Sequence, residues 1–310
     1  MTKQPETIPV LEVENLSVQF RMYDRGLRQR DLEVISQLDV SIEAGEILAV
    51  AGSSGSGKSL LAHAILGLLP GNAGTSGRIK FCGQTLTPEL QKKLRGQEMA
   101  LVPQSVTYLD PLMRVGKQVR GEKGTEAQQQ QAFARYGLGQ EAGRKFPFQL
   151  SGGMARRVLV STAVINDTKL IIADEPTPGL NPEIAEETLR NFRELADQGC
   201  GVMLITHDID LAFKVADRIA VFYAGTTVEI APAGDFVKGG DALRHPYSKA
   251  LWNALPQNGF TPIPGTQPYA GSQLSGCRFA PRCSDRTAEC TGDIPMRSVR
   301  GGKVRCVHAT

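Results

Sequence analysis

Residues 47–59 read ILAVAGSSGSGKS, in which a short apolar run leads into a turn rich in glycine and serine. Residues 52–59 match the pattern G-x-x-x-x-G-K-S/T in full, and residues 59–69 (SLLAHAILGLL) carry apolar side chains at helical spacing. We therefore predict a buried strand, a phosphate-binding loop and a helix. The backbone N–H groups of such a loop and the N-terminus of the helix are suited to hold phosphate oxygens.

The residues of this loop differ in their expected roles. Lys58 is expected to reach the β- and γ-phosphates of a nucleotide, and the Ser59 hydroxyl to bind Mg²⁺. A chance match is disfavoured by the strand before the loop and the helix after it, but the motif alone indicates only a nucleoside triphosphatase. The remaining phosphate-binding positions are Gly52, Ser53, Ser54, Gly55, Ser56 and Gly57.

Two further apolar segments end in polar side chains. LIIADEP (170–176) contains Asp174 and Glu175, and VMLITHD (202–208) contains His207. In such folds an acidic residue at the carboxyl end of a buried strand binds Mg²⁺, so Asp174 is a candidate metal ligand. Glu175 is a candidate general base for an attacking water, and His207 is placed to contact a γ-phosphate. The alternatives are an acid pair that opens a surface turn and a structural histidine.

The segment LSGGM at 150–154 precedes a helix predicted at 154–166. Ser151, Gly152 and Gly153 would offer a hydroxyl and free N–H groups to an anion at the start of that helix. The alternative is an ordinary helix cap by Ser151.

Strands that alternate with helices predict an α/β fold with a mainly parallel sheet. Residues 11–50 contain further strands, separated by a charged segment at 21–33 that we expect to be a solvated loop. A helix is predicted at 125–136, with Thr125 as its cap. After about residue 240, residues 245–256 (HPYSKALWNALP) predict a short amphipathic helix, and 257–276 form a linker rich in proline and glycine.

Composition excludes several classes of protein. Lys and Arg total 35 and Asp and Glu total 32, and this net charge of +3 does not indicate a nucleic-acid-binding protein. Hydrophobic residues make up 41% of the chain, as in globular proteins rather than disordered ones. No apolar run approaches the roughly 18 residues of a membrane span, and no signal peptide is visible. We expect a cytoplasmic location, where cysteines stay reduced.

These segments, in this order, resemble the ATP-binding subunits of ABC transporters. The resemblance covers about residues 11–230 and implies a P-loop NTPase fold with a RecA-like core, an antiparallel β subdomain and a helical subdomain at about 105–165. It divides the chain into an ATPase domain (1–242), a helix and linker (243–276) and a tail (277–310). The residues that carry it are those at 52–59, Gln104, LSGGM at 150–154, Asp174, Glu175 and His207.

The resemblance also implies roles and partners. Two such domains dimerise head to tail, and Ser151, Gly152 and Gly153 of one cover the ATP held by the other. Gln104 senses Mg²⁺ and the transmembrane partner, and Phe20 stacks on adenine, with Tyr23 as the alternative. ATP hydrolysis is the expected activity, with Mg²⁺ as its metal.

Three segments resemble the peptide and nickel importer branch more closely: residues 101–119, the HPYS element at 245–248, and the tail. This implies an ATPase subunit on the cytoplasmic face of the inner membrane, with a second and different ATP-binding subunit, two transmembrane permease subunits and an extracytoplasmic solute-binding protein, and no nucleic acid. Peptides are the expected cargo, with nickel or a metal chelate as the alternative. Ser53 stands where the family has glutamate, and Asn181 where it has an aspartate that couples the two nucleotide sites.

Two other functions are alternatives to transport. A non-transport ABC ATPase acting on DNA or ribosomes usually carries large coiled-coil insertions or tandem domains, and neither is seen here. A regulatory subunit that binds ATP without hydrolysis is disfavoured by Lys58, Glu175 and His207, although Asn181 leaves room for it.

The tail concentrates four of the six cysteines, with the spacing C-x5-C-x6-C-x15-C. Disulfides are disfavoured by the compartment, and the tight C-x2–4-C pairs of structural zinc are absent. Free buried thiols are a further alternative. Members of the branch with such a tail are similar in carrying a 4Fe–4S cluster, so we expect that cluster, with Zn²⁺ as the alternative. The expected ligands are Cys277, Cys283, Cys290 and Cys306.

Overall fold

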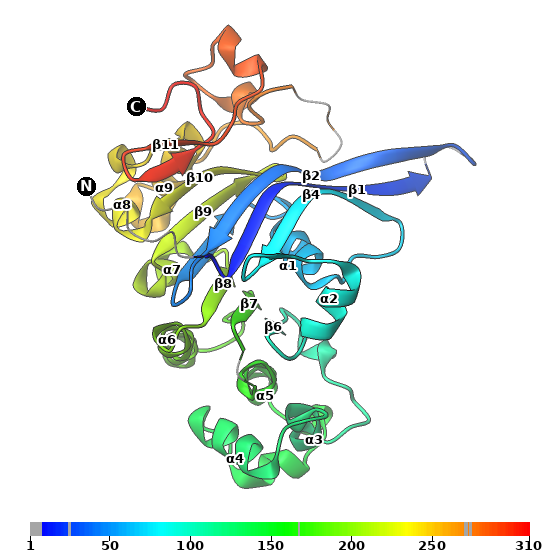
Figure 1. The fold of residues 1–310 in the computed structure, drawn as a ribbon. Helices are drawn as coiled ribbons and strands as arrows, with labels where there is room; N and C mark the ends of the chain where they lie inside the picture. The colour runs from blue at the N-terminus through cyan, green and yellow to red at the C-terminus, as the bar shows by residue number, and fades with distance from the viewer. Residues whose placement is uncertain (1–7, 24–25, 167, 270–271, 273–274) are drawn as a thin grey trace.

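The strand predicted at residue 47 lies inside the larger of two sheets. The computed structural model describes residues 8–23, 26–166, 168–269, 272 and 275–310. In these residues an eight-stranded sheet has the order β11-β12-β10-β9-β3-β8-β7-β6 (Figure 1). The strands from β9 to β6 run parallel, and β10, β12 and β11 extend the sheet antiparallel. Their bounds are β3 Ile47–Gly52, β6 Met99–Val102, β7 Leu170–Asp174, β8 Gly201–Ile205, β9 Arg218–Tyr223, β10 Thr226–Pro232, β11 Arg297–Val299 and β12 Gly302–Val304.

Helices cover both faces of this sheet. Leu61 and Ile65 of α1 are fully buried in one apolar cluster, together with side chains of the second sheet. Phe192 of α6 is fully buried in another cluster. The strand β3 is buried along its whole length, so its apolar run is the core of a three-layer arrangement. The helices are α1 Lys58–Leu66, α2 Pro88–Leu94, α3 Val115–Arg120, α4 Glu126–Arg135, α5 Gly152–Val164, α6 Pro182–Asp197, α7 Ile209–Val215, α8 Ala233–Lys238 and α9 Pro246–Asn253.

The second sheet is antiparallel, with the order β2-β1-β4-β5 in the described residues. Its strands are β1 Leu11–Tyr23, β2 Gln29–Ile42, β4 Ala73–Phe81 and β5 Gln84–Thr85. The prediction of a solvated loop at 21–33 was wrong, because β1 and β2 pair as far as Tyr23 and Gln29. The ladder satisfies the backbone there, while charged side chains such as Arg21 and Asp31, 3.4 Å apart, stay at the surface.

Helices α3, α4 and α5 lie together beyond the β6 edge of the sheet (Figure 1). They share an apolar cluster that includes Val119, Phe133 and Leu159. The helix predicted at 125–136 is confirmed as α4, and its Thr125 cap forms a reciprocal capping box with Gln128.

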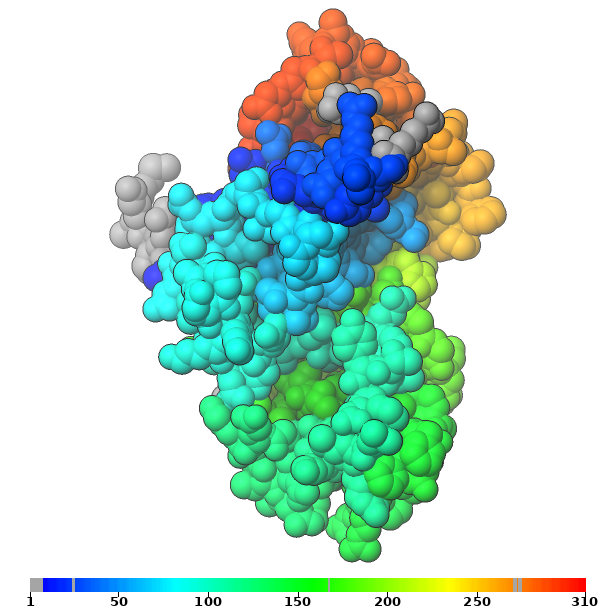
Figure 2. Space-filling view, turned by 90° about the vertical axis from the view of Figure 1, so that its right-hand side faces the viewer, coloured from blue at the N-terminus to red at the C-terminus, as the bar shows by residue number. Residues whose placement is uncertain are grey.

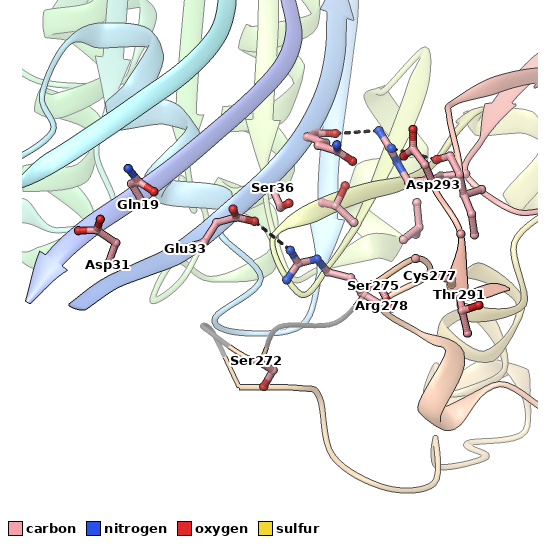
Figure 3. Close-up of a pocket in the computed structure, with 17 residues that line it drawn as sticks. Gln19, Asp31, Glu33, Ser36, Ser272, Ser275, Cys277, Arg278, Thr291 and Asp293 are labelled. Atoms are coloured by element: carbon pink, nitrogen blue, oxygen red, sulfur yellow. Dashed lines mark hydrogen bonds and ion pairs between the residues drawn. The ribbon is translucent and has the colours of Figure 1, made fainter. Parts of the chain in front are cut away.

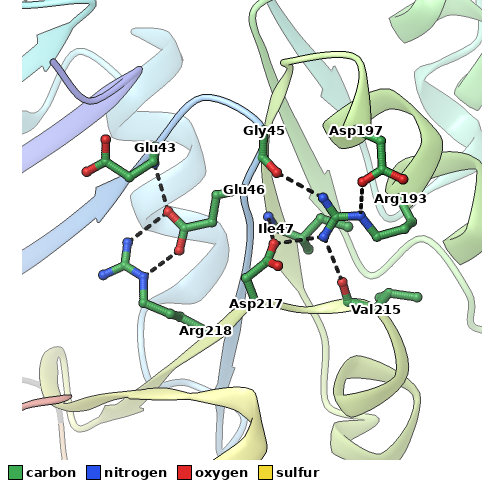
Figure 4. Close-up of polar contacts among 9 residues, drawn as sticks. All are labelled: Glu43, Gly45, Glu46, Ile47, Arg193, Asp197, Val215, Asp217 and Arg218. Atoms are coloured by element: carbon green, nitrogen blue, oxygen red, sulfur yellow. Dashed lines mark hydrogen bonds and ion pairs between the residues drawn. The ribbon is translucent and has the colours of Figure 1, made fainter. Parts of the chain in front are cut away.

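The N-terminal end of β3 is fixed by two arginines (Figure 4). Arg193 Nη1 donates to Asp217 Oδ2 at 2.8 Å, and the same carboxylate oxygen accepts from the Ile47 N–H at 2.8 Å. Arg218 Nη2 donates to Glu46 Oε2 at 2.8 Å. These contacts hold the strand at the end opposite to the glycine-rich turn.

The C-terminal residues pack on the domain rather than apart from it. The hairpin β11–β12 pairs with β10 and so joins the larger sheet. Figure 2 shows the tail against the β1–β2 side of the molecule. Arg244, which is 3% exposed, forms ion pairs with Glu229 and Asp235 and donates to the Val299 carbonyl at 2.6 Å. The tail is thereby attached to the core through buried groups.

Candidate functional site

The glycine-rich turn follows β3 and leads into α1. Gly52, with φ +155°, approaches the neighbouring strand so closely that a Cβ would lie 2.3 Å from the Phe222 carbonyl oxygen. Gly57 caps α1 with φ +98°, a conformation that other residues rarely adopt. The sequence therefore needs glycine at both ends of the turn, and the N-terminus of α1 faces the loop.

Lys58 is nearly buried, at 9% exposure, at the start of α1. Its Nζ donates to the carbonyl oxygens of Gly52 at 2.9 Å and Ser53 at 3.2 Å. Burial lowers the pKa of Lys58, while the charges of Glu175 and Asp174 act in the opposite direction. The ammonium group of Lys58 is thus enclosed by the loop and lies near two carboxylates. This is the position expected of a cation that binds a phosphate group.

Asp174 ends β7 beside this loop. Its Oδ1 is buried without a hydrogen-bond partner in the described residues. Burial raises the pKa of Asp174, and a hydrogen bond with Ser59 opposes that effect. A buried, unpartnered carboxylate oxygen next to a hydroxyl suits a hard cation, because Mg²⁺ prefers oxygen ligands.

Glu175 follows with a positive φ of 49°, which turns the chain sharply at the strand end. Its Oε2 lies 2.7 Å from Nδ1 of His207, and its side chain is only 11% exposed. The Glu175 N–H donates to the Ile205 carbonyl at 2.9 Å, and the pairing of β7 with β8 brings the two strand ends together. The carboxylate is therefore oriented by a histidine from the adjacent strand.

A pocket of about 410 Å³ brings together half of the sixteen residues predicted for the nucleotide site. Its wall is formed by the loop, by Gln104 after β6, and by Glu175 and His207. The lining residues are Val34, Ser54, Gly55, Gly57, Lys58, Ser59, Leu60, Gln104, Glu175 and His207.

Other predicted residues lie outside this lining. Phe20 is half-buried against the core of the antiparallel sheet, and Tyr23 is 65% exposed on the same strand. Ser151, Gly152 and Gly153 begin α5, where the Ser151 hydroxyl accepts from the Met154 N–H at 3.3 Å. Gly52, Ser53, Ser56 and Asp174 are also absent from the lining, and the Ser56 hydroxyl is buried without a partner in the described residues.

Arg156 is a site residue that the sequence reasoning missed. It is 5% exposed and lies in the second turn of α5. Its guanidinium donates to the carbonyls of Pro103 at 2.8 Å, Gln104 at 2.6 Å and Glu175 at 3.0 Å. It therefore fixes the backbone of two pocket residues relative to each other. The only sequence signal was an arginine in the helix after LSGGM.

A second missed feature connects the loop to the C-terminal region. The Ser53 hydroxyl donates to Gln267 Oε1, in the segment predicted as a linker. Tyr247 of α9 also interacts with Ser53: burial raises the pKa of Tyr247, and hydrogen bonds with the Ser53 side chain and backbone oppose this.

The structure does not confirm the metal centre expected at the four tail cysteines. Cys277 and Cys283 are half-buried, and Cys290 and Cys306 are buried. Burial raises the pKa of Cys277 to about 11, and the neighbouring thiols of Cys306 and Cys283 act in the same direction. Within the described part of the chain, no group of three or more His, Cys, Asp or Glu residues could hold a metal ion.

Comparison with protein families gives two matches. Residues 35–178 match the ABC transporter family model, and residues 228–290 match the model for the C-terminal region of oligopeptide/dipeptide transporters. A putative peptide import ATP-binding protein of Brucella abortus is 34% identical over 99% of this chain and 97% of its own length. The chain belongs to the ATP-binding proteins of ABC transporters. Within that family it falls in the oligopeptide/dipeptide branch.

Other ABC ATP-binding proteins are similar over most of their length. The dipeptide transport ATP-binding protein of Bacillus subtilis is 33% identical, covering 94% of this chain and 91% of its own. The oligopeptide transport ATP-binding protein of Escherichia coli is 32% identical, with coverages of 97% and 94%.

Solved ABC cassettes share the fold. A dimeric bacterial ABC transporter cassette superimposes with a TM-score of 0.64 at 22% identity, over 72% of this chain and 98% of its own. This confirms the predicted P-loop ATPase fold.

No helix among the described residues has the length and apolar character that a membrane crossing requires.

Proposed function

We propose that this chain is the ATP-hydrolysing subunit of a bacterial ABC importer for peptides. The observation that carries the proposal is the convergence of Lys58, Glu175 and His207 on one pocket at the carboxyl ends of parallel strands. The match of residues 228–290 to the oligopeptide/dipeptide C-terminal model supports the transport role.

In the proposed reaction ATP is the substrate, and Glu175 takes a proton from the attacking water. The water oxygen bonds to the γ-phosphorus as the bond from that phosphorus to the β–γ bridging oxygen breaks, which releases ADP and phosphate. His207, 2.7 Å from Glu175 Oε2, holds that carboxylate in place. Lys58 and the loop N–H groups bind the phosphates. Asp174, Ser59 and Gln104 are the residues that would hold Mg²⁺, which supplies positive charge against the phosphate oxygens when bound.

Ser151, Gly152 and Gly153 are assigned in this proposal to the ATP of a second ATP-binding subunit in a head-to-tail dimer. Their position outside the lining of their own chain's pocket supports this assignment. The proposed assembly also includes two transmembrane permease subunits and an extracytoplasmic solute-binding protein, with this chain at the cytoplasmic face of the membrane. Phe20 is proposed to contact the adenine.

Peptides are favoured over nickel as the cargo because the relatives from Brucella, Bacillus and Escherichia are all named for peptide transport. No specific observation favours the nickel alternative, a nucleic-acid-directed ATPase or a regulatory subunit.

The proposal is tested by reconstituting the chain with the permease subunits, a partner ATP-binding subunit and the binding protein in proteoliposomes. ATP-dependent uptake of labelled di- and oligopeptides is expected, and it should be lost with Glu175→Gln. Assembled vesicles that hydrolyse ATP but accumulate ⁶³Ni²⁺ instead of peptide would contradict the peptide assignment.

A further inference from the structure

Ser53 is the point where the C-terminal region touches the phosphate-binding loop. Its hydroxyl donates to Gln267 Oε1, 214 residues further along the chain. Its backbone carbonyl accepts from Lys58 Nζ at 3.2 Å and from the Ser56 N–H at 3.2 Å. The same residue therefore contacts the C-terminal region through its side chain and the catalytic lysine through its backbone.

Tyr247, whose pKa is raised by burial and lowered to a lesser degree by hydrogen bonding with Ser53, is packed among aromatic rings. It is 2% exposed, and its ring packs on Tyr223 at 4.4 Å and on Phe279 at 5.3 Å between centroids. Phe279 lies two residues after Cys277, and it also packs edge-on against Tyr223 at 5.3 Å. These three rings, which we call the aromatic cluster, join the HPYS element, the tail and the strand β9 next to the loop.

The segment that carries Gln267 is itself held by the tail. Arg282 Nε donates to the Pro264 carbonyl at 2.6 Å, and Nη2 donates to the Ile263 carbonyl at 2.9 Å. Its Nη1 donates to the Tyr223 hydroxyl at 3.2 Å. One tail arginine therefore fixes the linker against the aromatic cluster, with Gln267 over the loop.

The tail is in turn fixed to the antiparallel sheet. Arg278 Nη2 lies 3.0 Å from Glu33 Oε1 across a hollow of about 700 Å³ between the tail and that sheet (Figure 3). Arg305 Nη2 lies 2.8 Å from Asp39 Oδ2 on the same sheet. The whole series of contacts, from sheet to tail to linker to loop, is made of direct bonds and packed rings.

We propose that Gln267 and Tyr247 are positioning residues for the phosphate-binding loop, and that through Ser53 the C-terminal region sets the affinity of this chain for ATP. The inference rests on the proposed function, since it assumes that the loop binds ATP. A loop held before the nucleotide arrives loses less conformational entropy on binding, so removing these contacts weakens binding without removing any group that touches phosphate.

The test is the dissociation constant of the Mg²⁺ complex of a non-hydrolysable ATP analogue (AMP-PNP), measured calorimetrically on the full chain. Tyr247→Phe removes the hydroxyl and keeps the ring; Gln267→Met removes the acceptor and keeps the length. Each should raise the dissociation constant about 3- to 10-fold, the equivalent of one net hydrogen bond. In steady-state assays KM for ATP should rise to match, and kcat should change less than about 2-fold, as expected when uniform binding is lost.

Tyr223→Phe is the matched control, because its hydroxyl belongs to the same aromatic cluster but bonds to Arg282, which keeps its bonds to Pro264 and Ile263 in this variant, rather than to the loop. It should change the dissociation constant less than about 2-fold. In a Ser53→Ala background, Tyr247→Phe should have no further effect, since it acts through Ser53.

An unchanged affinity in both Tyr247→Phe and Gln267→Met would overturn the inference, and so would an equal loss in Tyr223→Phe. If Tyr247→Phe does not fold, Gln267→Met in the half-buried linker decides alone. A wild-type chain that binds no AMP-PNP would instead overturn the proposed function, so the two failures are distinguishable.

Discussion

Glu175 Oε2 and His207 Nδ1 lie 2.7 Å apart, one at the end of β7 and the other directly after β8. The contact orients a carboxylate that is almost withdrawn from solvent toward the pocket that holds Lys58. In the proposed reaction this carboxylate is the general base.

Glu175→Gln should abolish turnover and retain ATP binding, because the amide keeps the shape and cannot accept a proton. We expect kcat to fall by about 10²- to 10⁴-fold, the usual contribution of a general base. The measurement is phosphate release alongside AMP-PNP binding. Glu187→Gln, on the exposed face of α6, is the charge-matched control. Undiminished hydrolysis in Glu175→Gln would exclude Glu175 as the general base.

Arg156→Lys should lower kcat by about 10-fold, because a lysine cannot span the three carbonyls of Pro103, Gln104 and Glu175 and a buried carbonyl is left unpaired. The control is Arg157→Lys on the next position of α5. Arg157 donates to the Tyr136 and Gly137 carbonyls, away from the pocket. Both variants should lose stability, and only the first should lose turnover per folded molecule. Equal losses of turnover would show that Arg156 acts on stability alone.

The loop and the strands around it could be predicted because the residues of a contiguous motif determine the local backbone conformation. Glycine at 52 and 57 is required by the close approach of Phe222 and by the positive φ at the helix start. The family resemblance selected Gln104 and His207, and the pairing of parallel strands placed their side chains in one pocket.

Arg156 and Gln267 could not be predicted, for a physical reason. Their contacts are made with backbone or side-chain groups 19 to 214 residues away, so no local sequence pattern indicates them. Arg157, one position along, has the same charge and propensity as Arg156. The charged hairpin at 21–33 was missed because solvent exposure of both faces removes the apolar alternation by which strands are recognised.

Asn181→Ala should destabilise the chain by about 1 kcal/mol. Asn181 is the cap of α6, where its Oδ1 accepts from the Ile184 N–H at 2.9 Å. Asn181→Asp should preserve the cap and add a favourable charge at the helix N-terminus. Urea unfolding of both variants measures the difference. If the alanine and aspartate variants have the same free energy of unfolding, the side-chain cap of Asn181 does not contribute to stability.

Arg244→Met should release the β11–β12 hairpin from the sheet. The guanidinium is 1% exposed, is paired with Glu229 and Asp235, and donates to the Val299 and Arg300 carbonyls. Its removal leaves Glu229, which is fully buried, as an unpaired charge, and loss of one partner of such a pair costs roughly 3–5 kcal/mol. Hydrogen exchange at β12 should accelerate more than exchange at β3, because the lost bonds lie at the edge of the sheet. Arg300→Met removes a more exposed arginine from the same hairpin and should change exchange little; equal acceleration in the two variants would contradict an anchoring role for Arg244.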